Sequence, residues 1–208
     1  MVNNEEEYEE KDLRTHIYDT TDTYAGSDQL IKTTMAIMPD EETKIYLKDV
    51  DYIPVLYKMF DEIIVNSRDQ RERLKDFKDA TQLTEIRVNI NPENGEISVY
   101  NNGDGIKIEK HSSGLYNPQL IFGRLLTSGN YKKNQKRTVG GKNGYGAKIV
   151  NIFSDTFDVE TADRHTKKKY FQHFSKNMTK VDEPKIQKYN GKPYTKITWT
   201  TDFKRFGI

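Results

Sequence analysis

The spacing of hydrophobic residues predicts one long helix in the first half of the chain. Over residues 54–78, apolar side chains recur at intervals of three and four, as the buried face of an amphipathic helix requires. Pro54 suits the first turn of such a helix, because its fixed backbone angle is already helical. A second, shorter helix is predicted over residues 147–153, where a largely apolar stretch follows a glycine-rich segment.

Other parts of the chain alternate polar and apolar side chains, which is the pattern of half-buried strands. The segment 91–95, rich in Asn and Gly, predicts a hairpin turn between two of them. Because hairpins and helices are mixed in chain order, the pattern favours an α+β sandwich over a parallel βαβ fold. The predicted strands are residues 43–50, 84–90, 96–100, 156–161, 168–175 and 195–200.

Composition narrows the class of protein. The 208 residues suffice for one domain with a substantial core, and we predict that this domain spans residues 14–208. Residues 1–13 are predicted to be an acidic flexible tail, since 5–12 carry six acids against one lysine. The absence of cysteine excludes disulfides and thiolate chemistry. No apolar run approaches the ~20 residues of a membrane span, so we expect no membrane partner.

A glycine-rich loop is the strongest candidate for chemistry. Residues 140–146 contain four glycines directly before the second predicted helix. Closely spaced backbone N–H groups at a helix N-terminus bind phosphate well, and Lys142 and Lys148 add positive charge. A surface loop with no ligand is the alternative. The loop matches neither the Walker A motif nor the dinucleotide-binding fingerprint.

Polar residues on the long predicted helix form a second candidate cluster. At 100° per residue, Glu62, Asn66 and Asp69 fall within about 60° of one another. An Asn one turn after a Glu suits a hard cation or a bound water, because both offer oxygen ligands. A solvated polar face, with Asp69 paired to Arg73 one turn later, is the alternative.

Two turn-like segments complete the set of candidates. Asn101 opens the sequence Asn-Asn-Gly-Asp-Gly directly after a predicted strand, where the backbone can turn tightly against a flat ligand. Residues 127–130, which include Ser128, Gly129 and Asn130, offer hydroxyl and amide groups upstream of the glycine-rich loop. Each could also be an ordinary polar turn.

Taken in order, these clusters resemble the GHKL ATPases, the superfamily of DNA gyrase, Hsp90, histidine kinases and mismatch-repair ATPases. Within this superfamily, the sequence is similar to that of the N-terminal ATPase domain of eukaryotic-type (type IIA) DNA topoisomerases II. The resemblance runs from about residue 14 to the end and implies a Bergerat-type sandwich: a mixed, mainly antiparallel sheet with helices on one face. The matching segments are residues 22–27, 60–66, 120–128, 143–148, 151–154 and 159–162.

The resemblance also implies a role for each matching residue. Glu62 would be the general base, Asn66 would hold Mg²⁺, and Asn101 would read the adenine edge. Ser128 and Asn130 would touch ribose and phosphate, while the amides of 141–147 and the Lys148 ammonium would hold the triphosphate. Gly129 and Gln70 stand where serine and asparagine are usual, so their roles are open. The residues implied to bind ATP are Asn66, Asp69, Asn101, Ser128, Gly129, Asn130, Gly141, Lys142, Asn143, Gly144, Tyr145, Gly146, Ala147 and Lys148.

The same resemblance implies the wider context. Family members continue into a transducer domain and a DNA-cleavage core, both absent here, so we expect an isolated ATPase module that does not cleave DNA. ATP would bring two copies together, and DNA would be bound mainly by the missing parts. The location would be the nucleus for a eukaryotic source, or the host nucleus or cytoplasm for a viral one.

Two other functions remain open from the residues. The first is a GHKL ATPase of the chaperone or mismatch-repair type, although the sequence of the glycine-rich loop argues against this type. The second is a nucleic-acid-binding module without catalysis, because the basic runs 132–137 and 167–169 could contact backbone phosphates. A solvated charged loop is the alternative for the second run.

Overall fold

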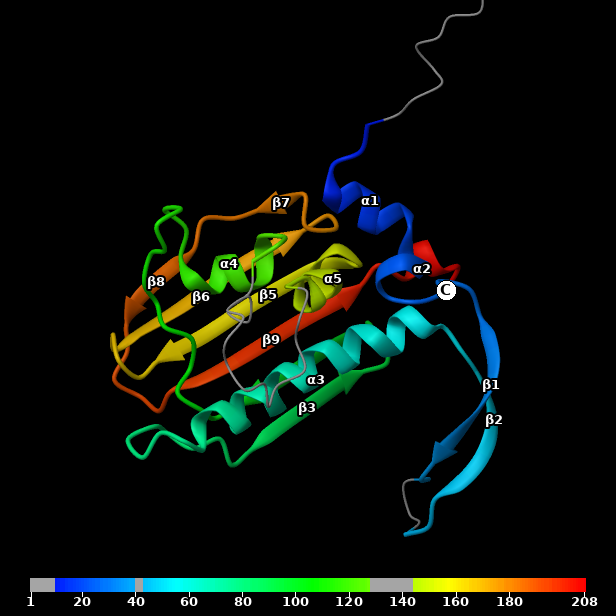
Figure 1. Ribbon diagram of the computed structural model, residues 1–208, viewed down its shortest axis with the longest axis horizontal. Helices are drawn as coiled ribbons and strands as arrows, with labels where there is room; N and C mark the ends of the chain where they lie inside the picture. Colours follow the sequence, from blue (N-terminus) through cyan, green and yellow to red (C-terminus); the bar gives the residue numbers. More distant parts are fainter. Residues whose placement is uncertain (1–9, 40–42, 128–143) are drawn as a thin grey trace, which may run out of the picture.

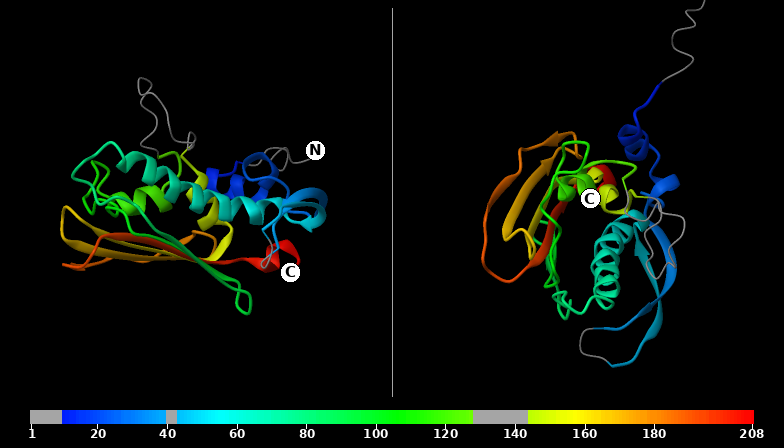
Figure 2. Two further views of the ribbon diagram at one scale, coloured as in Figure 1. Left: turned by 90° about the horizontal axis from the view of Figure 1, so that it is seen from below. Right: turned by 60° about the vertical axis from the view of Figure 1, so that its left-hand side comes forward.

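The computed structural model describes residues 10–39, 43–127 and 144–208. A sheet of seven strands forms one layer, and helices pack on one of its faces (Figures 1 and 2). The strand order is β3-β4-β9-β5-β6-β7, with β8 also paired to β6, and every pairing among the described strands is antiparallel. The strands are β3 (Ile86–Asn91), β4 (Glu96–Asn101), β5 (Ser154–Asp163), β6 (Lys168–Ser175), β7 (Lys180–Val181), β8 (Lys185–Lys188) and β9 (Tyr194–Thr201).

The helices and a separate hairpin complete the described fold. The hairpin of β1 (Ile31–Ile37) and β2 (Tyr46–Tyr52) forms its own two-stranded sheet, which extends away from the main body (Figure 1). The helices are α1 (Leu13–Asp19), α2 (Thr21–Tyr24), α3 (Pro54–Leu74), α4 (Asn117–Gly123) and α5 (Gly146–Ile152), with the 3₁₀ helix η3 (Phe203–Phe206) near the C-terminus.

The core lies between the helices and the sheet. Met59 and Ile63 of α3 and Ile149 of α5 are almost fully buried, and all belong to one cluster with Val99 and Ile197 of the sheet. Val99 and Ile197 lie opposite each other across β4 and β9, so they share a face. Burial of these side chains is what fixes the helices against the strands.

Most of the predicted elements are confirmed, but several boundaries differ. The long helix starts at Pro54 as predicted and ends at Leu74 rather than residue 78. The side chain of Gln82 donates to the Leu74 carbonyl at 2.8 Å and the Phe77 carbonyl at 3.2 Å, which replaces the helical hydrogen bonds there. The strand predicted over 43–50 is β2, displaced to Tyr46–Tyr52, because it pairs in register with β1.

The start of the folded domain and three of the strands also differ from the sequence-based prediction. Residues 1–9 lie outside the described ranges, but Asp12 and Leu13, predicted as tail, belong to a helix start. The Asp12 carboxylate accepts hydrogen bonds from the backbone N–H groups of Arg14 and Thr15 and so caps α1. The strands β1, β7 and β8 were not predicted from the residue pattern, because they are short or strongly exposed.

Candidate functional site: a nucleotide-sized cavity between α3, α5 and the sheet

A cavity of about 990 Å³ lies where α3, α5 and the ends of the central strands meet. Its walls combine the polar face of α3, the start of α5 and the ends of β4 and β9. Of the candidate residues predicted from sequence, Glu62, Asn66, Asn101, Gly144, Tyr145, Gly146, Ala147 and Lys148 line it. The structure therefore brings together side chains that are up to 86 positions apart in the chain.

Glu62 is held at one end of the cavity by two neighbours. Its Oε1 lies 2.7 Å from the Nζ of Lys58 one turn earlier on α3, and the same Nζ lies 2.9 Å from Asp61. Burial disfavours the charged form of Lys58, yet hydrogen bonds to Glu62 and Asp61 outweigh it and raise the pKa of Lys58. On the other side, the Glu62 carboxylate lies directly against the Cα of Gly146, at the start of α5.

The Gly146→Ala variant is expected to displace the Glu62 carboxylate while keeping the fold. The new methyl group would overlap Oε2 of Glu62, the end of a flexible side chain that can move aside, so we expect stability to change by less than about 1 kcal/mol. The family resemblance implies that Glu62 is the general base of ATP hydrolysis, and on that expectation the displacement should lower ATP turnover by about 10²-fold. Thermal unfolding and phosphate release test this, and an unchanged turnover rate would contradict it.

Asn66 and Asp69 differ in their surroundings, although both come from the same predicted polar face. Asn66 is exposed and lines the cavity, as expected. Asp69 is only 1% exposed, is absent from the cavity lining among the described residues, and lies 3.6 Å from the guanidinium of Arg68. The prediction that Asp69 faces outward beside Asn66 is therefore wrong. A helical wheel gives a direction around the axis and not what packs opposite it.

Asn101 also lines the cavity and is buried at the end of β4. Its Nδ2 donates to the Ser67 hydroxyl at 3.2 Å, and that hydroxyl donates to the Ile63 carbonyl. Thr195 of β9 lies opposite Asn101 in the sheet and also lines the cavity. Because β4 supplies an amide and the neighbouring strand β9 supplies a hydroxyl, this part of the cavity wall can form hydrogen bonds with the polar edge of a flat ligand.

Two threonine hydroxyls form a hydrogen bond beside Asn101. The hydroxyls of Thr195 and Thr161 lie 3.0 Å apart on neighbouring strands, and Thr161 donates to the Tyr194 carbonyl at 2.9 Å. The Thr161 hydroxyl also accepts from the backbone N–H of Ile106, another cavity residue. Sequence reasoning missed Thr161 and Thr195, because strand alternation predicts which face a side chain takes but not which strands are neighbours. It also assigned no polar role to Ser67 of α3.

Lys148 lies on α5 with its side chain turned into the protein. It is 3% exposed, and its ammonium donates to the Thr127 carbonyl at 2.7 Å and to the Gly144 carbonyl. Burial lowers the pKa of Lys148 to about 8. The ammonium thus joins the two described residues on either side of 128–143 at the cavity wall. It is a buried positive charge whose hydrogen bonds, within the described residues, go to backbone carbonyls.

The remaining part of the glycine-rich loop cannot be placed. Ser128, Gly129, Asn130, Gly141, Lys142 and Asn143 lie outside the described residues, as does the basic run 132–137. In the part that is described, Gly144 has φ +73°, a left-handed conformation that glycine adopts without strain, and the chain enters α5 two residues later. A glycine-rich turn followed by a helix is therefore confirmed at residues 144–152.

Aromatic residues close the cavity on the side of α2, which the sequence did not indicate. Thr23 and Tyr24 line it, and the Tyr24 ring meets the Tyr145 ring edge-on at 5.6 Å. The Tyr24 hydroxyl also lies 3.1 Å from Nδ1 of His16. Gln70 and Arg73 of α3 line the cavity as well, with the Arg73 guanidinium 3.5 Å from the Gln70 amide oxygen. The usual patterns of turn and helix residues carry no signal for these contacts.

The chain belongs to the histidine kinase-, DNA gyrase B- and HSP90-like ATPase family, which it matches over residues 52–181. It is 44% identical over 209 residues to DNA topoisomerase 2 of Acanthamoeba polyphaga mimivirus, which covers 98% of this chain and 16% of that protein. These comparisons confirm both the resemblance and the fold class expected from the sequence.

Two solved structures have the same fold over almost the whole chain. The ATPase region of Saccharomyces cerevisiae topoisomerase II superposes with a TM-score of 0.89 at 41% identity, covering 97% of this chain and 52% of the yeast chain. The ATPase and transducer domains of DNA topoisomerase II from Balamuthia mandrillaris superpose with a TM-score of 0.91 at 36% identity. That superposition covers 98% of this chain and 52% of the Balamuthia chain. The chain spans only 13–16% of the length of curated relatives such as those of mimivirus and Penicillium chrysogenum.

The structure adds one finding on membranes. Within residues 10–39, 43–127 and 144–208, no helix combines the length and apolar character needed to cross a bilayer.

Proposed function

We propose that this chain is the ATP-binding and ATP-hydrolysing region of a type II DNA topoisomerase. The observation that carries the proposal is one cavity whose lining includes both a carboxylate on α3, Glu62, and a buried amide at the end of β4, Asn101. A nucleotide site needs both kinds of group, because one must read the base and the other must act on a phosphate. A volume of about 990 Å³ lies within the range of small-molecule sites.

Glu62 would act on the attacking water. A carboxylate accepts the hydrogen bond that orients a water molecule and takes its proton as the water attacks the terminal phosphorus. Lys58 and the Cα of Gly146 restrict the carboxylate on two sides, so it needs little reorganisation before reaction. Release of the Lys58 contact would free Oε1 to accept the proton.

Asn66 would provide a protein ligand for Mg²⁺ bound with the nucleotide. Its exposed amide on the cavity wall offers an oxygen, which is the donor type that a hard cation prefers. No group of three or more Asp, Glu, His or Cys side chains within the described residues could hold a metal by itself, which fits an ion bound largely by phosphate oxygens and water. When bound, Mg²⁺ would neutralise charge that develops on the phosphates.

The start of α5 would hold the triphosphate. Residues 144–147 line the cavity wall, where their backbone N–H groups would bind phosphate oxygens, and Lys148 supplies a positive charge at the same place. Residues 128–130 and 141–143 would complete the contacts to ribose and phosphate. Asn101, with Thr195 beside it, would hold the adenine. The chemistry agrees with these residue types, because phosphoryl transfer to water depends on positioning and charge neutralisation.

The wider function would follow from the longer relatives. In the protein that contains this chain, ATP binding would bring two copies together, and hydrolysis would separate them while DNA strands pass. DNA would be bound mainly by other domains. The protein would act in the nucleus of a eukaryotic source, or in the host nucleus or cytoplasm for a viral one. Similarity to topoisomerases over nearly the whole chain favours this function over a chaperone or mismatch-repair ATPase.

Calorimetry with a non-hydrolysable ATP analogue tests the central claim. We expect saturable binding to the 208-residue chain that tightens when Mg²⁺ is added. Circular dichroism on the same sample shows whether the chain is folded. A folded chain that binds no analogue would contradict the proposal, while DNA binding that falls steeply with salt and does not respond to the analogue would favour a nucleic-acid-binding module instead.

A further inference from the structure

Asp104 lies in the loop that follows β4, but it is not among the residues that line the cavity. Asn101 at the end of β4 and Gly105 and Ile106 of the loop do line it. Asp104 is the only charged residue between positions 101 and 106 and is 9% exposed. A carboxylate buried this far is unfavourable unless donors surround it.

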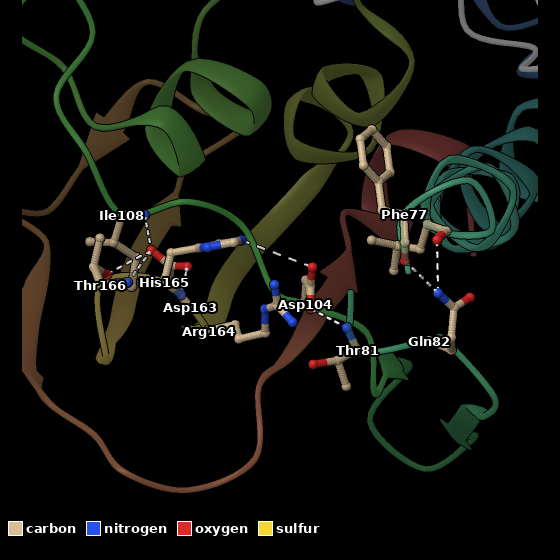
Figure 3. Close-up of polar contacts among 10 residues, drawn as sticks. Phe77, Thr81, Gln82, Asp104, Ile108, Asp163, Arg164, His165 and Thr166 are labelled. Carbon is tan, nitrogen blue, oxygen red and sulfur yellow. Dashed lines mark hydrogen bonds and ion pairs between the residues drawn. The ribbon is translucent and has the colours of Figure 1, made fainter. Parts of the chain in front are cut away.

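Three segments of the chain meet at this carboxylate, as Figure 3 shows. The backbone N–H of Thr81, in the segment after α3, donates to Oδ1 at 2.6 Å. The Arg164 guanidinium, at the turn between β5 and β6, lies 3.3 Å from the same oxygen, and Nε2 of His165 lies 4.0 Å from Oδ2. The Asp104 carbonyl also accepts from the Arg164 backbone N–H at 3.1 Å.

Close backbone packing makes this loop sensitive to its supports. Gly105 has φ +75°, and a side chain there would overlap the Ala162 carbonyl at the end of β5. Gly103 is packed against Leu74 and Leu83, which belong to the end of α3 and the segment beyond it. The loop therefore packs between the end of α3, the helix that carries Glu62, and the end of β5. The Asp104 carboxylate contacts both the segment after α3 and the turn after β5.

We propose that Asp104 is a positioning residue for recognition of the nucleotide base. Its carboxylate ties the segment after α3 to the β5–β6 turn and so holds Gly105 and Ile106 at the spacing that a purine ring requires. The inference rests on the nucleotide binding proposed above and adds to it a residue that does not touch the ligand. Its effect should be confined to the base, because its carboxylate contacts Thr81, Arg164 and His165, none of which belongs to α5, the helix proposed to hold the phosphates.

Comparing two ligands separates this role from a general structural one. The first is a non-hydrolysable ATP analogue, and the second is inorganic tripolyphosphate, which has the phosphates and lacks the base. For Asp104→Ala we expect the affinity for the ATP analogue to fall about tenfold, which is within the range of coupled polar contacts. The affinity for tripolyphosphate should stay within about twofold of the unchanged chain. Calorimetry with both ligands gives the two values.

Two further variants keep the test decisive if Asp104→Ala does not fold. Asp104→Asn keeps the shape of the side chain and removes its charge, while Arg164→Gln removes the partner. Each should weaken binding of the ATP analogue several-fold, and the double variant should lose less than the product of the two losses. Asp158→Asn is the matched control, because Asp158 lies on β5, has Oδ1 2.6 Å from Nδ1 of His173, and does not line the cavity.

The outcomes distinguish this inference from the proposed function. Equal losses for both ligands would show a general structural role and overturn the inference, as would unchanged affinity for the ATP analogue in all three variants. If the unchanged, folded chain binds neither ligand, the proposed function itself fails. A loss of base recognition with tripolyphosphate binding retained would establish Asp104 as a positioning residue.

Discussion

Replacing Glu62 with glutamine is expected to abolish ATP hydrolysis while leaving binding of a non-hydrolysable analogue within about threefold. The amide has the size of the carboxylate and can still accept a hydrogen bond from Lys58, so the cavity keeps its shape. It cannot take a proton from water at neutral pH, and loss of a general base slows a reaction by about 10²- to 10⁴-fold. Single-turnover phosphate release gives the rate, and calorimetry gives the affinity.

The matched control for this variant lies on the same helix. Glu72→Gln makes the same chemical change two to three turns further along α3, where Glu72 pairs with Lys75 and does not line the cavity. We expect this variant to hydrolyse ATP at the unchanged rate. If Glu62→Gln retained normal turnover, or if Glu72→Gln lost as much, Glu62 would not be the general base.

Replacing Lys148 with methionine is expected to alter both nucleotide binding and the pH dependence of stability. The variant should lose more affinity for an ATP analogue than for ADP, because the missing charge is the one proposed to hold the triphosphate at the start of α5. An equal loss for the two nucleotides would argue against a contact with the terminal phosphate. The control is Lys32→Met, because Lys32 is an exposed lysine on β1. This variant should leave both affinities unchanged.

The stability effect of Lys148 follows from its lowered pKa. Burial lowers the pKa to about 8 in the folded chain from the ordinary value of 10.5, so between these values the unfolded chain binds the extra proton. Stability therefore rises as pH increases through that window, and the penalty for burying the charge is fully present below about pH 8. From pH 7.5 to 9.5, this single group should add about 2 kcal/mol to the free energy of unfolding.

The methionine variant isolates that contribution. Other groups titrate in the same range, but they are shared by both proteins, so the difference between the two unfolding curves reports Lys148. Urea unfolding at pH 7.5 and 9.5 measures it. We expect the unchanged chain to gain about 2 kcal/mol relative to Lys148→Met between these pH values, and parallel pH dependences would show that the Lys148 ammonium is not buried in solution.

The sequence indicated the main elements because their signals are local. The helix from Pro54, the hairpin of β3 and β4, and the strand β6 all follow from side-chain spacing within a few residues. The end of α3 could not be located this way, because it depends on Gln82, whose side chain returns to the Leu74 carbonyl. The position of β2 likewise depends on its pairing with β1, which has no clear signal of its own.

Local sequence sets the residue types of the site: a carboxylate and an amide one turn apart on α3, an amide at the end of β4, and glycines at the start of α5. Only the tertiary structure decided which of them meet. Strand order placed Thr195 beside Asn101, and packing buried Asp69 and Lys148. The physical reason is that spacing along the chain sets the direction of a side chain, whereas burial and pKa depend on distant segments that close around it.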